Sequence, residues 1–183
     1  MIRPLALCAA LLLPGAVLAA DYVQAPGSTL TFATQYDGEA VAGRFPVFAT
    51  RLHFDPAKPD GSRLDVVIPL GSTTIADKDR DTTLRSPDFL DVAKFPQARF
   101  TSTKFRALSG GRFAADGQLA LRGVTRPVTL VFTWTPGAQP VLNGSATVKR
   151  LDFGIGGGDW AKPTLIPNEV RVNTKVVFSP AAK

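Results

Sequence analysis

Few residues in this chain have the types and spacing that catalysis requires. His53 is its only histidine, and no second imidazole or nearby thiol is available to complete a zinc site. Arg51, His53 and Asp55 alternate, which indicates one polar face of a strand. A Ser-His-Asp triad is recognised only in space, so that alternative stays open. No GxSxG, HExxH or CxxC motif and no GKS or GKT phosphate loop occurs. We therefore expect no catalytic site and no metal site.

A run of five charged residues, DKDRD at 77–81, is a second candidate for chemistry. One interpretation is a solvated loop whose ion pairs contribute little. The other is that Arg80, together with Arg85, contacts the polar head group of a ligand. We keep Arg80 as a candidate ligand-binding residue.

The segments that must position these residues alternate between apolar and polar side chains. This period of two is typical of half-buried β-strands, and turn-forming residues interrupt it at 56–61, 109–111, 136–140 and 156–158. Asn143-Gly144 predicts a further hairpin turn. The pattern predicts one antiparallel all-β domain, and the clearest alternating runs are Leu30, Phe32, Thr34, Tyr36; Leu64, Val66, Ile68, Leu70; Val128, Leu130, Phe132, Trp134; and Val170, Val172, Thr174, Val176.

One short helix is expected within this β-structure, over residues 87–94. Ser86 is a favourable N-cap residue, Pro87 suits the first helical position, and Asp88 complements the helix dipole. The pair Phe95-Pro96 ends the helix, since a residue before proline avoids the α region. Its apolar face would include Phe89 and Leu90, which we expect to pack outside the β-structure or to cap it.

Several distinctive motifs follow one another along the chain: GRFPVF at 43–48, FDPAKP at 54–59, DRDTTLRSPDFLDVAKFPQARFTST at 79–103, GQLALRGVTRPVTLVF at 117–132 and RLDFGI at 150–155. Their order resembles that of the YceI-like family of secreted bacterial proteins. The resemblance implies a lipocalin-like, eight-stranded antiparallel β-barrel that holds a polyisoprenoid or a similar amphiphile. Periodicity alone leaves a two-sheet sandwich open, because both architectures alternate inward and outward residues.

The first twenty residues are predicted to be a secretory signal peptide, which leaves residues 21–183 as the barrel domain. Arg3 precedes an apolar run, and Ala19 and Ala20 offer small residues for cleavage. The alternative, a membrane anchor, would need a longer apolar stretch of about twenty residues. Cys8 is the only cysteine and lies in this run, so the remaining chain has no thiol. We expect export to the periplasm of a Gram-negative bacterium.

The formal net charge of +6 does not by itself indicate nucleic acid, because the basic residues are scattered without a run of three. A solvated surface is the simpler interpretation, and an anionic lipid head group or membrane face is the alternative. Expected partners are therefore an amphiphilic lipid and, transiently, a membrane or a membrane redox protein. No nucleic-acid partner and no cofactor are expected beyond a bound polyisoprenoid or isoprenoid quinone.

The predicted function is a non-enzymatic periplasmic binding or carrier protein for such an amphiphile. One alternative is an enzyme acting on a lipid-like substrate through residues such as His53 or Asp79. Another is an adhesion or stress-response module with a filled barrel. The ligand-binding residues we predict from the inward alternation are Phe32, Phe45, Leu64, Val66, Ile68, Arg80, Leu119, Leu121, Leu130, Phe132, Val170 and Val172.

The glycine-rich segment at 154–160 and Arg150 each allow two interpretations. GIGGGDW at 154–160 lacks the last glycine of a dinucleotide-binding fingerprint, so it is either a plain loop or a lid at the barrel mouth that carries Trp160. Arg150 continues the inward alternation of Ala146 and Val148. If its charge points inward it needs a partner, and Asp152 is available two residues later.

Overall fold

The computed structural model describes residues 20–181. The predicted signal peptide, residues 1–20, lies outside this range except for Ala20, which begins the first strand. No helix within residues 20–181 is long and apolar enough to cross a membrane. The strands are β1 Ala20–Gln24, β2 Thr29–Tyr36, β3 Glu39–Arg44, β4 Ala49–Phe54, β5 Arg63–Pro69, β6 Gln97–Ala107, β7 Arg112–Leu121, β8 Val124–Thr135, β9 Val141–Lys149 and β10 Glu169–Pro180.

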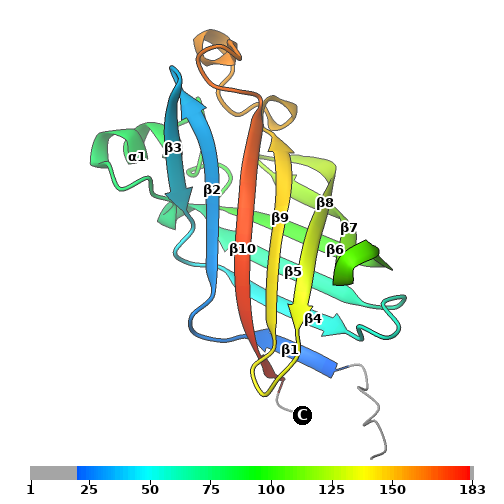
Figure 1. Cartoon of the computed structure of the whole chain (residues 1–183). Coiled ribbons are helices and arrows are strands. Elements are labelled where there is room, and N and C mark those ends of the chain that lie inside the picture. Colours follow the sequence, from blue (N-terminus) through cyan, green and yellow to red (C-terminus); the bar gives the residue numbers. More distant parts are fainter. Residues whose placement is uncertain (1–19, 182–183) are drawn as a thin grey trace, which may run out of the picture.

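The strands form one antiparallel sheet that closes on itself (Figure 1). β10 pairs with β9 on one side and with both β1 and β2 on the other, while β1 pairs with β4 and β2 with β3. β1 and β2 therefore act as one interrupted strand, and β3 and β4 as its interrupted neighbour. Counted in this way, the ten strands make an eight-stranded barrel. This confirms the predicted fold class.

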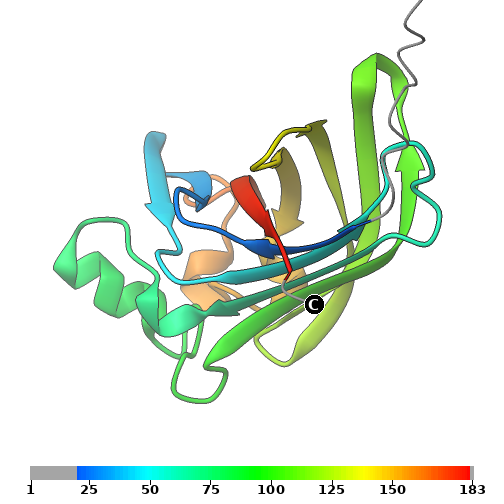
Figure 2. The same cartoon turned by 90° about the horizontal axis from the view of Figure 1, so that it is seen from below.

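The barrel has two different ends. The connections β2–β3, β5–β6, β7–β8 and β9–β10 lie at one end, which we call the open end. The connections β4–β5, β6–β7 and β8–β9 lie at the other, the closed end, together with the pairing of β1 and the last residues of β10. Figure 2 views the molecule from below and shows β1 in dark blue beside the red end of β10.

Aromatic side chains fill the closed end. Phe54 from β4 lies at the centre, with its ring 5.1 Å from that of Phe113 and 5.5 Å from that of Phe132. These edge-to-face contacts are the arrangement that aromatic quadrupoles favour. These aromatic side chains form the core of the closed end. This aromatic cluster consists of Tyr22, Phe54, Phe105, Phe113, Phe132, Trp134 and Phe178.

The predicted position of the helix is wrong. The α-helix, α1, is Lys78–Arg85, and its N-cap is Asp77, whose side chain accepts hydrogen bonds from the main-chain N–H groups of Asp79 and Arg80. Ser86 is the C-cap, and residues 87–94 form turns. Asp91 has a φ of 48°, in the left-handed region, which an uninterrupted helix cannot contain. The Asn143-Gly144 turn is also wrong, since both residues lie within β9.

Short 3-10 turns complete the open end: η1 Leu70–Ser72, η3 Arg150–Phe153 and η4 Gly158–Ala161, while η2 Ser109–Gly111 lies in the β6–β7 connection. Figure 1 shows α1 beside β3 and the orange β9–β10 connection above the ends of the strands. β3 does not pair with β5. Among the described residues, the edge of β3 that faces away from β2 forms one isolated β-bridge, between Arg44 and Thr74. The wall next to β3 is thus completed by the β5–β6 connection rather than by a strand.

Candidate functional site

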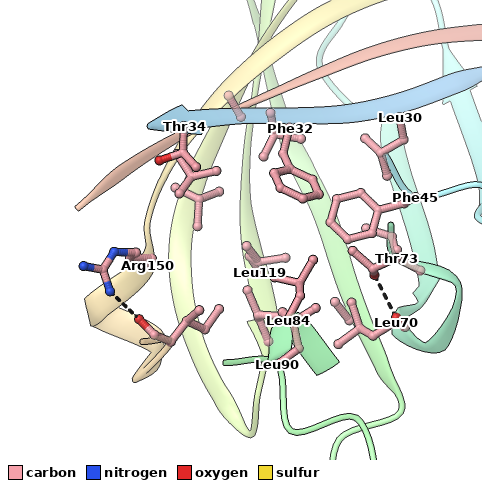
Figure 3. A pocket seen from close by; sticks show the side chains of 18 of the residues that line it. Leu30, Phe32, Thr34, Phe45, Leu70, Thr73, Leu84, Leu90, Leu119 and Arg150 are labelled. Atoms are coloured by element: carbon pink, nitrogen blue, oxygen red, sulfur yellow. Dashed lines mark hydrogen bonds between the residues drawn. The ribbon is translucent and has the colours of Figure 1, made fainter. Parts of the chain in front are cut away.

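The upper part of the barrel encloses a cavity of about 490 Å³. Inward-facing side chains of β2 to β10 line it, and side chains from α1 and the open-end connections cover it (Figure 3). Almost all of these side chains are apolar, and Arg80 and Arg150 are the charged ones. The volume lies in the range of roughly 300–1,000 Å³ typical of small-molecule sites.

The structure brings together all of the predicted ligand-binding residues except Phe132. Phe132 points inward, as its alternation predicts, but it is 1% exposed and packs in the aromatic cluster instead of lining the cavity. The predicted residues that line the cavity are Phe32, Phe45, Leu64, Val66, Ile68, Arg80, Leu119, Leu121, Leu130, Val170 and Val172.

Several lining residues were not among the predicted site residues. Some continue the inward alternation of their strands and could have been found in this way, for example Phe100 and Leu142. Others come from connections where no period applies. Examples are Thr73, Ile75, Leu84, Ile155 and Ile166. Phe89 and Leu90 also line the cavity, and from the β5–β6 connection they cap its open end.

Glycine at position 43 explains how one of the lining rings fits. Gly43 faces Phe32 across the β2–β3 pair, and a Cβ atom added there would collide with the Phe32 ring and lie 2.8 Å from Ile75 Cγ2. Without a side chain, β3 allows the Phe32 ring to lie over its backbone and face the cavity. The ring also packs on Phe45, with centroids 5.3 Å apart.

Three aromatic rings from separate segments meet at the mouth of the cavity. Trp160, in the β9–β10 connection, lies 5.4 Å from the ring of Phe89 and 6.4 Å from the ring of Tyr36. The guanidinium of Arg80 lies 5.9 Å above the Tyr36 ring, within the range of a cation–π contact. All four residues line the cavity. Trp160 thus lies at the mouth of the cavity, a position that fits both the plain-loop and the lid interpretation of this segment.

Arg150 holds this loop in place through main-chain carbonyl groups. It is 3% exposed, and its five N–H groups donate to the carbonyl oxygens of residues 155, 156, 160, 166 and 167 at 2.6–3.1 Å. Asp152 is exposed and is not the partner that the sequence indicated. β9 ends at Lys149, so the two-residue period no longer applies beyond it. Burial lowers the pKa of the Arg150 guanidinium, yet arginine stays charged in proteins.

Arg122 joins two of the open-end connections. It lies in the two-residue turn between β7 and β8, where Arg122 and Gly123 both have positive φ, as a type I′ hairpin turn requires. Its guanidinium donates to the carbonyl oxygens of Pro87 at 2.5 Å and Gly154 at 2.7 Å. These contacts link the cap over the cavity to the loop that carries Trp160.

Within the charged run at 77–81, Asp81 has a structural role, separate from the position of Arg80 at the cavity. The Asp81 carboxylate accepts hydrogen bonds from the Thr74 hydroxyl at 2.6 Å and the Ile75 N–H at 2.7 Å, and it lies 3.6 Å from the Arg85 guanidinium. Burial raises the pKa of Asp81, but these hydrogen bonds and the charge of Arg85 together lower it below its ordinary value. Arg85 donates to the Thr73 carbonyl oxygen at 3.0 Å, so its donors face the chain rather than the cavity.

His53 lies away from the cavity. Its Nδ1 atom is 2.8 Å from the Asp21 carboxylate, and both side chains are solvent-exposed. Asp79, the other residue on which the enzyme alternative depends, is exposed on α1 and does not line the cavity. Within residues 20–181, no group of three or more His, Cys, Asp or Glu side chains is placed to hold a metal ion.

Comparison with known proteins assigns this barrel to a family. A model of the YceI-like domain matches residues 22–178, which is nearly the whole described chain. The chain belongs to the YceI-like family. A UPF0312 protein of Shewanella denitrificans is 39% identical over 158 residues, covering 80% of this chain and 83% of the relative. One from Pseudomonas syringae pv. tomato is 34% identical over 172 residues, covering 88% and 90%.

Solved structures of similar fold agree with this assignment of a YceI-like barrel. BcnA of Burkholderia cenocepacia superimposes with a TM-score of 0.78 at 26% identity, covering 82% of this chain and 95% of BcnA. A polyisoprenoid binding domain from Saccharophagus degradans has a TM-score of 0.68 at 16% identity, covering 90% of this chain and all of that domain. At this identity the second likeness shows the fold alone.

Proposed function

We propose that this YceI-like protein binds an amphiphile with a polyisoprenoid tail, which occupies the cavity while the head group lies at the mouth. The observation that carries the proposal is the cavity itself, a volume of about 490 Å³ enclosed almost entirely by apolar side chains. A volume of this kind favours a long hydrocarbon ligand over a polar one. The polyisoprenoid binding domain of Saccharophagus degradans, a barrel of the same fold, supports the choice of tail.

The energetics of burial make such binding feasible without specific polar contacts. Burying one isoprene unit of five carbons contributes about 3 to 4 kcal/mol before other terms are considered. Association and ordering oppose binding by roughly 4 to 15 kcal/mol. A tail of several units can therefore reach about micromolar affinity, near −8 kcal/mol.

Arg80 is the residue that we assign to the head group. Of the two charged residues that line the cavity, Arg150 uses all of its N–H groups on main-chain carbonyl oxygens. Arg80 is about half exposed, and its nearest carboxylate oxygen, from Asp77, is 3.9 Å away, beyond hydrogen-bond distance. Its donors are therefore available to a phosphate or to the carbonyl oxygen of a quinone ring.

The proposal extends to place and partners. A predicted signal peptide at residues 1–20 supports a periplasmic carrier that takes up its ligand from a membrane or a membrane redox protein. The filled-barrel alternative is less favoured because the described barrel holds a cavity. The enzyme alternative is less favoured because His53 and Asp79 lie outside that cavity.

The experiment that tests the proposal is organic extraction of the protein purified from its native periplasm, followed by mass spectrometry without added ligand. We expect one co-purifying isoprenoid of defined mass, enriched above the lipid background of a matched periplasmic protein. The extracted protein should bind added prenyl alcohol in a titration. The proposal fails if repeated preparations give only background lipid and the extracted protein takes up no isoprenoid.

A further inference from the structure

We infer that the aromatic cluster is the floor of the binding site and sets the longest tail that the barrel accepts, with Phe132 as the residue that determines this length. This inference rests on the proposed function and adds a selection among tails to it. It assigns a role in ligand specificity to Phe132, although this residue does not itself line the cavity.

The cavity ends at the aromatic cluster on two strands of the barrel. On β8 the inward positions Val128 and Leu130 line it, whereas Phe132, the next inward residue, does not. On β10 the lining ends at Val176, and Phe178 follows as the next inward residue. On both strands a residue of the aromatic cluster follows directly after the lining, so a tail that enters from the mouth meets this layer of rings end-on.

Phe132 follows the lining residue Leu130 on β8 and is held in this layer by three neighbouring rings. Its ring lies 5.5 Å from that of Phe54, 5.5 Å from that of Phe113 and 6.2 Å from that of Phe105. Gly144 of β9 faces it across the strand pair, and an added Cβ there would lie 3.0 Å from the Phe132 Cβ and 3.0 Å from Leu130 Cδ1. No space remains in this layer for a hydrocarbon tail. Protein interiors are close-packed, so inserting even one methyl group here would strain the surrounding side chains.

Two variants should move the floor in opposite directions. Phe132→Ala removes a ring directly beneath Leu130 and lengthens the cavity, and Phe132→Leu does so to a smaller extent if the alanine variant does not fold. Leu142→Phe enlarges a side chain that lines the cavity and pairs with Trp134 at the edge of the aromatic cluster, and shortens the cavity. Phe153→Leu is the matched control. Phe153 is buried in η3 at the open end and belongs neither to the cavity lining nor to the aromatic cluster.

The measurement is competitive binding of farnesol, geranylgeraniol and solanesol, which share a hydroxyl head group and differ in the number of isoprene units. For Phe132→Ala we expect the ratio of affinities for the longest bound alcohol and the next shorter one to rise by about tenfold or more, since each newly buried CH₂ is worth about fourfold. For Leu142→Phe we expect the ratio to fall. Phe153→Leu should leave the ratio unchanged.

The outcomes separate this inference from the proposed function. If wild-type protein binds the alcohols but both floor variants keep the wild-type length preference, the role of Phe132 is overturned and the proposed function stands. If wild-type protein binds none of the alcohols, the proposed function is overturned and the inference with it. Thermal unfolding of each variant shows whether a lost affinity comes from a lost fold.

Discussion

The Arg150 Nη2 atom donates a hydrogen bond of 2.7 Å to the carbonyl oxygen of Trp160, the residue whose ring lies at the mouth of the cavity. The main chain of Trp160 is therefore held by the buried guanidinium of Arg150, which lies in the same β9–β10 connection. Four further carbonyl oxygens of this loop accept from the same guanidinium. One buried side chain thus holds the loop that carries Trp160 at five main-chain positions.

Arg150→Met should destabilise the protein by about 3 kcal/mol or more, because it leaves several buried carbonyl oxygens without donors. Arg150→Lys should cost less, since an ammonium group supplies three N–H donors. Urea unfolding measures both losses, and hydrogen exchange should show faster exchange in residues 155–167. Arg126→Met, at an exposed arginine that bonds only to its neighbour Thr125, should change stability by less than about 0.5 kcal/mol. Equal losses in the Arg150 and Arg126 variants would contradict this role.

Asp81→Asn should lower the free energy of unfolding at neutral pH by about 1 kcal/mol. It should also weaken the pH dependence of that free energy in acid. The pKa of Asp81 is depressed in the folded protein, so its ionised form stabilises the fold above the unfolded pKa of about 4, and this contribution is lost as the pH falls through the lower folded pKa. Urea unfolding at about pH 6 and about pH 3 measures the difference. Asp79→Asn, exposed on the same helix, is the control and should retain the wild-type pH dependence. The explanation is wrong if Asp81→Asn retains it too.

Arg80→Ala should weaken binding of geranylgeranyl phosphate by about tenfold, the value of a charge-assisted hydrogen bond at a partly exposed site. Binding of geranylgeraniol, which has the same tail without the charge, should change little. Titration of both ligands separates the head-group contact from burial of the tail. Lys78→Ala removes a cation from the same helix at a position that does not line the cavity, and should affect neither ligand. An equal loss for phosphate and alcohol would assign Arg80 to packing alone.

Trp160→Ala should increase the rate at which a bound prenyl alcohol leaves, and lower its affinity by about tenfold, because two aromatic contacts at the mouth are lost. Stopped-flow displacement of the bound alcohol measures the rate. Trp160→Phe keeps a ring at this position and should recover most of the affinity. An unchanged release rate in Trp160→Ala would mean that the ligand leaves by another route.

The strands followed from the sequence because period two is strong here, whereas the barrel was implied by the family resemblance. The alternating runs around Phe32, Val66, Leu130 and Val172 lie in strands except for Leu70, which begins η1, and the four named central residues line the cavity. Alternation gives the direction of a side chain but not its depth along the barrel axis. Phe132 was therefore assigned to the site, although only the aromatic rings of distant strands decide where the cavity ends.

The position of the helix and the hydrogen-bond partners of Arg150 could not be predicted from sequence patterns, each for a different reason. Ser86-Pro87 is favourable at a helix start, but proline is also common just after a helix end, and Asp77 is an equally good N-cap. The contacts of Asp81 and Arg85 with the segment at 73–75, which local patterns do not reveal, stabilise the helix at 78–85. The five acceptors of Arg150 are main-chain atoms, which no residue type reveals.

The pairing of Gln24 with Phe178 joins the first strand of the barrel to the last. Together with the pairing of β2 with β10, this contact closes the ring, and these two pairs have far greater sequence separations than the other strand pairs, so their loop-closure entropy is the largest. Closure of the ring therefore waits for the complete polypeptide, because β1 and β2 lack one partner until β10 exists. A chain that stops before Glu169 is an open sheet with two free edges, and such edges invite pairing between molecules.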